Sequence, residues 1–495
     1  MDFNEIPLDW LEPATLIEIK ANYQNIGVLP YPEKVVLIGH KLATGTLAPG
    51  QIAQITRGEE GIAYFGQGSI GAEMVAAFRK ANKTTPLFVT ALADAAGATK
   101  AAGKLTFTGN VPVAMVLRFK IAGRQVRITV RATDTAANMA TALAAAINAD
   151  LANVVTAAAA LGVVTCTAKS GGEVGNDIVL KVDVKAQALP PSLTVAIDPM
   201  AGGAGNPLVQ AALDTIANTW FTKALTPWSD ATNMAAMAQW VADRYVATAK
   251  LDVHAFVAKN GTFGQLTTFG NLTNSPFMTA MGLKNSPTSS WNYAAAACGL
   301  ASFHLTNDPA RQLRSLVLPG VEAPDELDQF EETEQNLLLA NGISTFDHLS
   351  DGTTTISRMV TTYKTSSLGI PDRAWMDIMV PATMSRIRYD WAGYVTLMYP
   401  RSKLAEDDSA ASFATSYDDN GAVNTAVVTP GRMKASWTAR CKLYSDNVWI
   451  EDTQATIKQS KFAIATSDRN RLEARQQVKI VGNLMVFASS LEFQV

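Results

Sequence analysis

The chain has 495 residues, with 41 lysines and arginines against 44 aspartates and glutamates. That length is too great for one hydrophobic core and predicts roughly three or four domains. The near balance of charge argues against direct nucleic-acid binding and against attachment to an anionic membrane. The three cysteines, Cys166, Cys298 and Cys441, are too far apart for a spaced metal site or an even disulfide framework. A reducing compartment is expected.

The first residues, MDFNEIPLDW, are acidic and include Pro7. A signal peptide would begin with basic residues and an apolar run. No uncharged apolar stretch reaches the roughly 18 residues that a membrane-spanning helix needs. We therefore expect neither export nor membrane insertion. Residues 1–25 include the short extended run LIEIK and are interpreted as an N-terminal arm.

Residues 26–94 are expected to form a first α+β domain. EKVVLIGHKL and QIAQI have the composition of strands, and TTPLFVTALAD is typical of a buried strand. SIGAEMVAAFRKAN places Met74, Val75 and Phe78 at helical spacing.

Residues 95–205 differ in character and are predicted to be an inserted small α+β domain with small-residue linkers at both ends. IAGR predicts a hairpin turn at Ala122 and Gly123 before the alternating strand VRITVR. TDTAANMATALAAAINAD predicts a helix capped by Thr133 or Asp134. GVVTCTAK, DIVLKVDV and SLTVAID add further strands.

The remaining chain divides into three expected regions. In residues 206–320, strand-like and helix-like segments alternate, which predicts an α/β layer with a mostly parallel sheet. Residues 321–477 begin acidic and helical and include a helix from about Ala382 to Met398, so we expect a C-terminal α+β domain. Residues 478–495 alternate as a strand up to the last residue. An uncovered strand edge invites pairing with another chain, so this strand belongs either to its own sheet or to another subunit.

GQGSIG, residues 66–71, fits the G-x-G-x-x-G pattern and precedes a helix. An NAD-dependent enzyme would use Gly66, Gly68, Gly71 and Asp94, and this is the alternative function. The preceding IAYF is short for a buried parallel strand, and no hydride-transfer site follows. A tight turn with a helix cap explains the same glycines.

Hydrolytic and metal chemistry have little support in the sequence. His254, His304 and Asp230 are possible members of a triad, but no G-x-S-x-G elbow exposes a nucleophile. His254 lies in an apolar strand and is expected to be a core residue. Neither H-E-x-x-H nor paired Cys-x-x-Cys occurs. We assign no catalytic, cofactor-binding or metal-binding residues, and expect no cofactor.

Two distant segments carry opposite charge. The first, between Glu322 and Glu334, is acidic. Without a binding role, it would be the solvated face of a helix. The second, SDRNRLEARQQVK, is basic. Their charges suit contacts between copies of the chain, so the candidate inter-subunit charges are Asp325, Glu326, Glu331, Glu332, Arg469, Arg471 and Arg475.

Several blocks occur in the order found in one known family. LLANGIST, ISRMVTTYKT, GIPDRAWMDI, SRIRYDWAGY, YPRSKLAEDD and RQQVKIVGNLMVFASSLEF resemble the C-terminal half of the tail sheath protein of Mu-like contractile-tailed bacteriophages. FNEIP with LIEIKANYQ resembles that family's arm, and GQGSIGAEMVAAFRKAN its first domain. The resemblance covers nearly the whole chain outside residues 95–205.

The resemblance implies a structural subunit that polymerises as stacked sixfold rings around an inner tail tube and contracts to drive the tube through the host envelope for genome delivery. It implies a central subtilisin-like but non-catalytic α/β layer in residues 206–320 and an inner assembly domain in residues 321–477. It also implies that the inserted domain of residues 95–205 faces outward. It also implies extended terminal arms that cross to neighbours, the last strand being donated, with a candidate hinge at residues 467–470. The implied arm residues are Phe3, Ile6, Leu16, Ile17, Ile19, Val478, Ile480, Leu484, Val486, Leu491 and Phe493.

The resemblance also implies partners and a location. Besides other copies of itself, the chain is expected to contact the inner tube protein, baseplate proteins and a tail terminator, in a virion assembled in the host bacterial cytoplasm. The family counterpart of the helix from about Ala382 lies in the inner domain. The candidate tube-contacting cations are therefore Arg386, Arg388, Arg401 and Lys403. Solvated charges around a core helix remain the bland alternative.

Overall fold

The computed structural model describes residues 27–185, 188–409, 416–417, 423–424 and 427–493. By its internal contacts the chain divides into two compact units. The larger unit combines Pro32–Arg386 with Ile480–Val495, and the smaller combines Met1–Tyr31 with Ile387–Lys479. Both units therefore contain segments that are distant in sequence.

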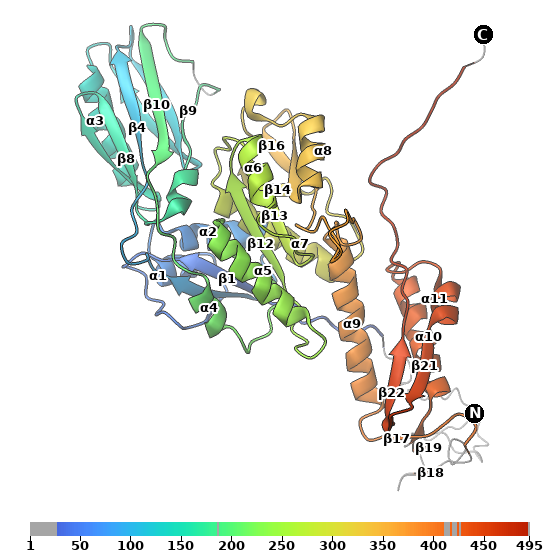
Figure 1. Cartoon of the computed structure of the whole chain (residues 1–495). Coiled ribbons are helices and arrows are strands. Elements are labelled where there is room, and N and C mark those ends of the chain that lie inside the picture. The colour runs from blue at the N-terminus through green and yellow to red at the C-terminus, as the bar shows by residue number, and fades with distance from the viewer. Residues whose placement is uncertain (1–26, 186–187, 410–415, 418–422, 425–426, 494–495) are drawn as a thin grey trace, which may run out of the picture. The chain divides into compact units, whose positions relative to one another are not determined.

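A nine-stranded sheet forms the centre of the larger unit (Figure 1). Six neighbouring strands are parallel. One antiparallel strand lies at one edge of this group, and at the other side an antiparallel strand is followed by an outermost strand that again runs in the direction of the six. All six residues of β1 (Val35–His40) are buried, as expected for a parallel strand covered on both faces. In spatial order the strands are β14 (Val317–Glu322), β16 (Thr353–Arg358), β15 (Ile343–His348), β13 (Met278–Leu283), β12 (His254–Asn260), β11 (Lys223–Leu225), β1 (Val35–His40), β3 (Leu87–Leu92) and β2 (Ala53–Ile55).

Helices cover both faces of this sheet. From β1 the chain steps to β3, towards one edge of the sheet, and from β11 it steps to β12 and then β13, towards the opposite edge. Because parallel crossovers are right-handed, the helices of these two connections fall on opposite faces, as Figure 1 shows for α2 and α5. The helices are α1 (Glu60–Phe65), α2 (Ile70–Ala81), α4 (Gln210–Thr215), α5 (Ala231–Tyr245), α6 (Phe263–Gly270), α7 (Ser290–Asn307) and α8 (Glu332–Ala340), with the 3₁₀ turn η2 (Glu326–Asp328).

The sheet contains strands from both sides of the predicted domain boundaries at 94 and 320. Strand β1 from residues 26–94 pairs with β11, with Val35 opposite Lys223, and β3 pairs with the other side of β1. Strands β14 to β16 from the predicted C-terminal domain join the same sheet. The chain therefore closes one core from three sequence regions, and the division between units falls at Ile387.

The inserted domain contains two antiparallel sheets and one helix, an α+β composition. Ala122 and Gly123 both have positive φ, of 52° and 79°, in the predicted hairpin turn. The helix is capped by Thr135, whose side chain accepts the Asn138 N–H, and not by Thr133 or Asp134. The elements are β4 (Ala102–Gly109), β5 (Met115–Ile121), β6 (Arg124–Val130), α3 (Ala136–Ala149), β7 (Val155–Ala160), β8 (Val163–Ala168), η1 (Glu173–Asp177), β9 (Leu180–Val182) and β10 (Leu193–Ala201).

The smaller unit is built around two helices. The predicted helix from Ala382 to Met398 is confirmed as α9 (Met379–Met398), within which the two units divide. A hairpin of β21 (Lys461–Ala465) and β22 (Asp468–Arg475) turns at residues 466–467. The candidate hinge at residues 467–470 spans this turn and the start of β22. The remaining elements are α10 (Pro430–Asp446), α11 (Thr453–Gln459), β17 (Lys403–Leu404), β18 (Ser416–Tyr417), β19 (Val423–Asn424) and β20 (Val427–Val428).

Candidate assembly surfaces

The GQGSIG loop does not form a dinucleotide site. The segment before it is helix α1 and not a strand, and Ser69 caps α2 by accepting the Ala72 N–H at 3.2 Å. The inserted domain covers the loop: a Cβ at Gly68 would lie 2.4 Å from Lys169 Nζ and 2.6 Å from the Asn153 carbonyl. A bound pyrophosphate would need that space. The loop therefore cannot bind NAD in the predicted way, and the NAD-dependent alternative is wrong.

Asp94 also has a structural role in place of the predicted ribose contact. Its Oδ1 lies 2.7 Å from His40 Nε2 and accepts the Gly171 N–H at 2.9 Å. The hydrogen bond with His40 lowers the pKa of Asp94. Asp94 therefore ties the start of the insertion to the sheet.

The possible triad residues have separate structural partners. His254 is buried, with Nε2 2.8 Å from Thr279 Oγ1, and burial lowers its pKa well below the usual value. Asp230 caps α5 and accepts a hydrogen bond from Asn206, and His304 lies on α7. Among the residues that the structure describes, no cluster of His, Cys, Asp and Glu is arranged to hold a metal ion.

The root of the N-terminal arm is fastened inside the smaller unit. Asp390 Oδ1 accepts the Leu29 N–H at 2.7 Å, and the Arg440 guanidinium donates to the Gly27 carbonyl at 3.2 Å. Arg440 Nε also donates to Asp390 at 2.9 Å, and the Tyr444 hydroxyl donates to the same carboxylate at 2.5 Å. These contacts fix where the chain enters the unit. The predicted arm residues Phe3, Ile6, Leu16, Ile17 and Ile19 lie outside the described residues.

Sequence reasoning missed this ion pair, although a signal was present. On α9, Thr383, Ile387 and Asp390 are buried at helical spacing, and on α10 the buried face includes Trp437 and Arg440. A carboxylate and a guanidinium at core positions of two helices indicate pairing, because unpaired buried charges are strongly disfavoured. The choice of partner still required the tertiary structure.

The β21–β22 hairpin presents strand edges. Within the described residues, each of its strands pairs only with the other. Phe462, Ile464 and Leu472 are partly buried, whereas most of β22 is exposed, including Arg469, Arg471 and Arg475. Arg471 Nε lies 3.0 Å from Glu473 Oε1 on the same strand. The hairpin can therefore accept a further strand.

The C-terminal segment contains two different parts. Lys479 is held in the smaller unit, where its carbonyl accepts the Glu451 N–H at 2.9 Å. Ile480 is partly buried, while Leu484 is 70 % exposed. From Val486 onward every described residue is exposed. Exposure is 77 %, 98 % and 84 % for Val486, Leu491 and Phe493.

The acidic segment combines acids that pair within the chain with acids that are exposed. Asp325 pairs with Lys181 and also lies 3.3 Å from Lys185, both from the inserted domain. Glu331 caps α8. Of the predicted inter-subunit charges, Glu326, Glu331 and Glu332 remain exposed. Asp325 is already used to hold the insertion.

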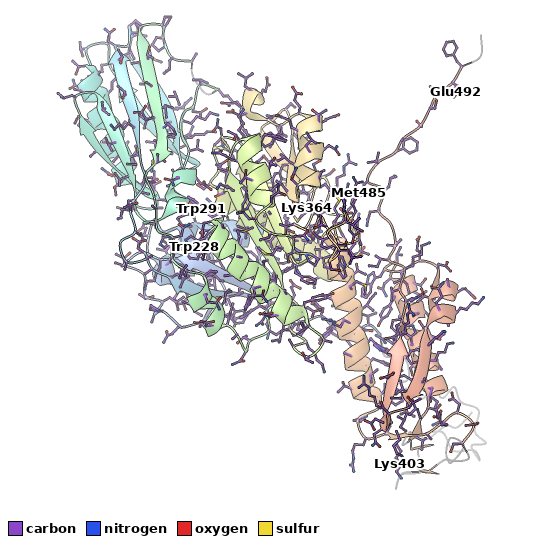
Figure 2. The ribbon with its side chains drawn as sticks, viewed as in Figure 1. Trp228, Trp291, Lys364, Lys403, Met485 and Glu492 are labelled. Carbon is purple, nitrogen blue, oxygen red and sulfur yellow. The ribbon has the colours of Figure 1, made fainter. Side chains whose placement is uncertain are left out.

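The predicted tube-contacting cations occupy two environments. Arg386 and Arg388 lie on α9 and are partly buried, each with an interaction of its own. Arg401 and Lys403 are exposed after the end of that helix, and Figure 2 labels Lys403. Only the second pair offers freely accessible positive charge.

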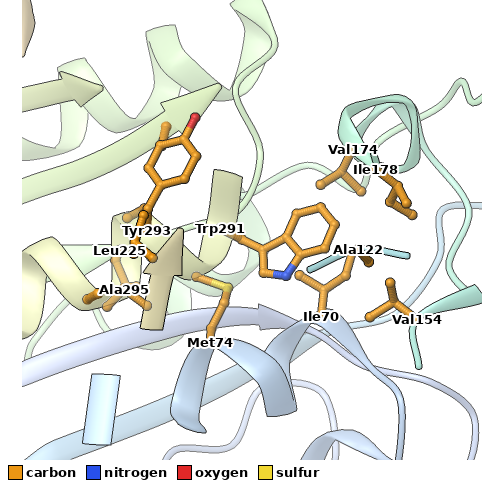
Figure 3. Packing of buried hydrophobic residues seen from close by; sticks show 14 of the residues in the cluster. Ile70, Met74, Ala122, Val154, Val174, Ile178, Leu225, Trp291, Tyr293 and Ala295 are labelled. Carbon is orange, nitrogen blue, oxygen red and sulfur yellow. The ribbon is translucent and has the colours of Figure 1, made fainter. Parts of the chain in front are cut away.

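The insertion and the sheet share a buried apolar contact (Figure 3). Trp291 from α7 and Ile70 from α2 pack with Ala122, Val174 and Ile178 of the inserted domain. Two partly buried carboxylates lie beside this contact. Glu73 Oε2 accepts hydrogen bonds from Trp291 Nε1 and Asn292 Nδ2, and Asp177 accepts one from Ser290. The insertion is therefore packed against the sheet over buried surface.

A relative covers the full length. The chain is 30% identical over 495 residues to the Mu-like prophage FluMu tail sheath protein of Haemophilus influenzae, covering 100% of this chain and 99% of that protein. No family model matches the sequence. The chain therefore belongs to the family of Mu-like tail sheath proteins. It is a subunit of the sheath of a contractile tail, a structural protein and not an enzyme.

Solved sheath proteins are also similar at low identity. The sheath tail protein of Desulfitobacterium hafniense has 12% identity and a TM-score of 0.46, over 94% of this chain and 100% of that one. The sheath tail protein of Listeria innocua has 12% identity and a TM-score of 0.48, over 92% and 94%. The anti-feeding prophage helical sheath in its contracted state has 10% identity and a TM-score of 0.45, over 97% and 98%. The family assignment rests on the Haemophilus relative.

Proposed function

We propose that this sheath subunit polymerises as a helical homopolymer of stacked sixfold rings around an inner tail tube, joined by arms donated between subunits. Two observations carry the proposal. Residues 486–493 form an exposed segment with apolar side chains. The β21–β22 hairpin of the same chain has strand edges that the described residues leave unpaired. A water-exposed run containing Val486, Phe487, Leu491 and Phe493 is costly for an isolated subunit. Burial against a neighbour removes that cost.

Strand addition suits this task. The free edges of the hairpin offer N–H and C=O groups, and an incoming strand supplies the complementary groups while its alternate side chains fix the register. The roots of both arms are held in the smaller unit, at residues 27–29 and at Lys479. A pull on either arm is thus transmitted to a folded unit. Head-to-tail contacts of this kind do not close on themselves and generate a helix.

Contraction then converts one packing of the same subunits into another. The extended sheath stores free energy as the difference between the two packings, and a baseplate partner releases it. The contracting sheath drives the tube through the host envelope for genome delivery. No nucleotide or metal takes part in this proposal, and neither does direct contact with nucleic acid. In the described residues, no helix combines the length and apolar character needed to cross a bilayer.

The location and other partners follow from the same proposal. The sheath forms part of a virion tail assembled in the host bacterial cytoplasm, bounded by the baseplate and a tail terminator. Arg401 and Lys403 contact the tube, while Arg469, Arg471 and Arg475 on β22 face acidic groups of a neighbour. The likeness of the central sheet to subtilisin remains a prediction about architecture.

Electron microscopy of the purified chain tests the proposal, with the register of the arm as the variable. Inserting one alanine between Phe487 and Ala488 moves every later side chain to the opposite face of the strand, whereas inserting two restores the faces. We expect tubes from the parent chain and from the two-residue insertion, and none from the one-residue insertion. Tubes from a chain lacking residues 486–495 would show that the arm is not donated.

A further inference from the structure

The chain just before the exposed arm is attached to a loop of its own larger unit. Asn483 Nδ2 donates to the Ala310 carbonyl at 2.8 Å, and the Gln312 N–H donates to Asn483 Oδ1 at 3.2 Å. Gln312 Nε2 donates to the Leu484 carbonyl at 3.3 Å, and Arg314 to the Met485 carbonyl at 3.4 Å. Four hydrogen bonds therefore connect residues 483–485 to residues 310–314, which we name the clamp loop.

The chemistry of Asn483 matches this loop. Its carboxamide donates to one backbone carbonyl and accepts from one backbone N–H, so both ends are used. Aspartate keeps only the acceptor, and alanine keeps neither. In Asn483→Asp the charged carboxylate would face the Ala310 carbonyl with no hydrogen between the two oxygens.

The clamp loop is a firm base for the contact. It joins α7 to β14, and its residues Ala310 and Leu313 are 3 % and 2 % exposed. Met485 packs against the core of the same unit. In Figure 2, Met485 lies at the body and Glu492 lies far out along the free segment. The loop cannot shift without disturbing the core beneath it.

Exposure changes abruptly at the end of the clamped stretch. Val481, Asn483 and Met485 are partly buried, and the residues between them are exposed, which is the alternation of an extended chain lying on a surface. From Val486 the alternation stops and both faces are exposed. The segment predicted as one donated strand, residues 478–495, thus has a bound half and a free half.

We propose that the clamp loop with Asn483 is the positioning site of the C-terminal arm, and that the donated strand begins at Val486. The inference rests on the proposed donation of the arm and adds where it starts and what aims it. A strand that leaves from a fixed point searches a smaller volume for its acceptor edge, which raises its effective concentration there.

Limited proteolysis of the unassembled full-length chain tests the clamp by itself. Chymotrypsin cleaves after large apolar residues, so Phe487 reports on the free half, and Leu484 and Met485 report on the clamped half. In the parent chain we expect rapid cleavage after Phe487 and protection after Leu484 and Met485, read by mass spectrometry. Asn483→Ala should speed cleavage after Met485 by about tenfold, since local opening sets the rate. Gln477→Ala, an exposed amide earlier in the segment, should change neither.

Assembly provides the second readout. Asn483→Ala should also slow tube formation, and Asn483→Asp should resemble it, whereas Gln477→Ala should assemble like the parent. Parent chain that is cleaved after Met485 as fast as after Phe487 would overturn the clamp. So would an Asn483→Ala chain with the faster cleavage but unchanged assembly, because positioning would then have no effect. Neither result touches the donation of the arm, which fails only if the chain lacking residues 486–495 forms tubes.

Discussion

Asp390 and Arg440 form an ion pair that is sealed inside the smaller unit. Arg440 Nε donates to Asp390 Oδ2 at 2.9 Å, and the two side chains are 1 % or less exposed. The pair links α9 to α10, and its spare hydrogen-bonding capacity is used by Gly27, Leu29 and Tyr444. One buried pair thereby sets both the helix packing and the exit of the N-terminal arm.

Removing one partner of this ion pair should strongly destabilise the smaller unit. Arg440→Ala leaves the Asp390 carboxylate buried without its cation, so we expect a loss of about 3–5 kcal/mol in the stability of the smaller unit. Lys442→Ala, an exposed cation on the same helix, is the matched control and should cost less than about 0.5 kcal/mol. Chemical denaturation followed by circular dichroism measures both. Equal stability of the two variants would contradict a structural role for the pair.

The contact between the insertion and the sheet should weaken as pH rises. Burial raises the pKa of Glu73 from 4.5 to about 7 and that of Asp177 from 3.8 to about 6. Because the folded protein holds these protons more tightly than the unfolded chain, their contribution is fully present below pH 4.5 and 3.8, respectively. It is lost as pH rises through about 7 and 6. Arg124 and Asp150 also face Glu73, and Lys259 faces Asp177.

Glu73→Gln should remove the larger part of this pH dependence of stability, because Glu73 has the larger pKa shift of the two carboxyl groups. Both hydrogen bonds to Glu73 end on Oε2, which an amide oxygen can replace. We expect the variant to be more stable than the parent at pH 8 by on the order of 2 kcal/mol, and nearly equal at pH 4.5. Thermal unfolding across this range measures it, and Glu59→Gln at an exposed site is the control. A parent chain whose stability rises from pH 5 to 8 relative to Glu73→Gln would refute the assignment.

Excision of the insertion should leave the sheet and the tubes intact. Thr99 and Ala204 exchange backbone hydrogen bonds of 2.9 and 3.3 Å, so a two-glycine linker can join them after residues 100–203 are removed. Excision uncovers Trp291 and Ile70, so we expect lower solubility together with retained polymerisation. Circular dichroism and electron microscopy report on the two outcomes. A folded excised chain that never forms tubes would make the insertion part of the assembly contact.

Charge reversal at Arg401 and Lys403 should weaken binding to the tube while sparing self-assembly. Both cations are exposed, so each pair with an acid on the tube contributes at most about 1 kcal/mol and is screened by salt. Many such contacts grip the tube and still release it on contraction. Co-sedimentation with tube protein across a salt series measures the effect, with Lys442→Glu and Lys458→Glu as a charge-matched control. Unchanged binding by the reversed pair at all salt concentrations would exclude this segment from the interface.

The sequence by itself determined the local secondary structure and the family of the protein. The helix over Ile70–Ala81, the turn at Ala122 and Gly123, and the helix α9 follow from periodicity and turn chemistry between near neighbours. The family also follows from sequence, because several blocks in one order are far more specific than a single motif such as GQGSIG.

Only the tertiary structure decided which distant segments meet. The hydrogen bond from the Lys34 N–H to Thr222 Oγ1 joins residues 188 apart, and the hydrogen bond from Asn483 Nδ2 to the Ala310 carbonyl joins residues 173 apart. Periodicity reports which face of an element is buried, but not the partner that buries it. The single sheet formed by residues 35–358, the ion pair of Asp390 with Arg440, and the clamp on Asn483 all depend on such long-range partners. Their identity is settled only when the core closes, because that is when buried charges and backbone groups must find partners away from water.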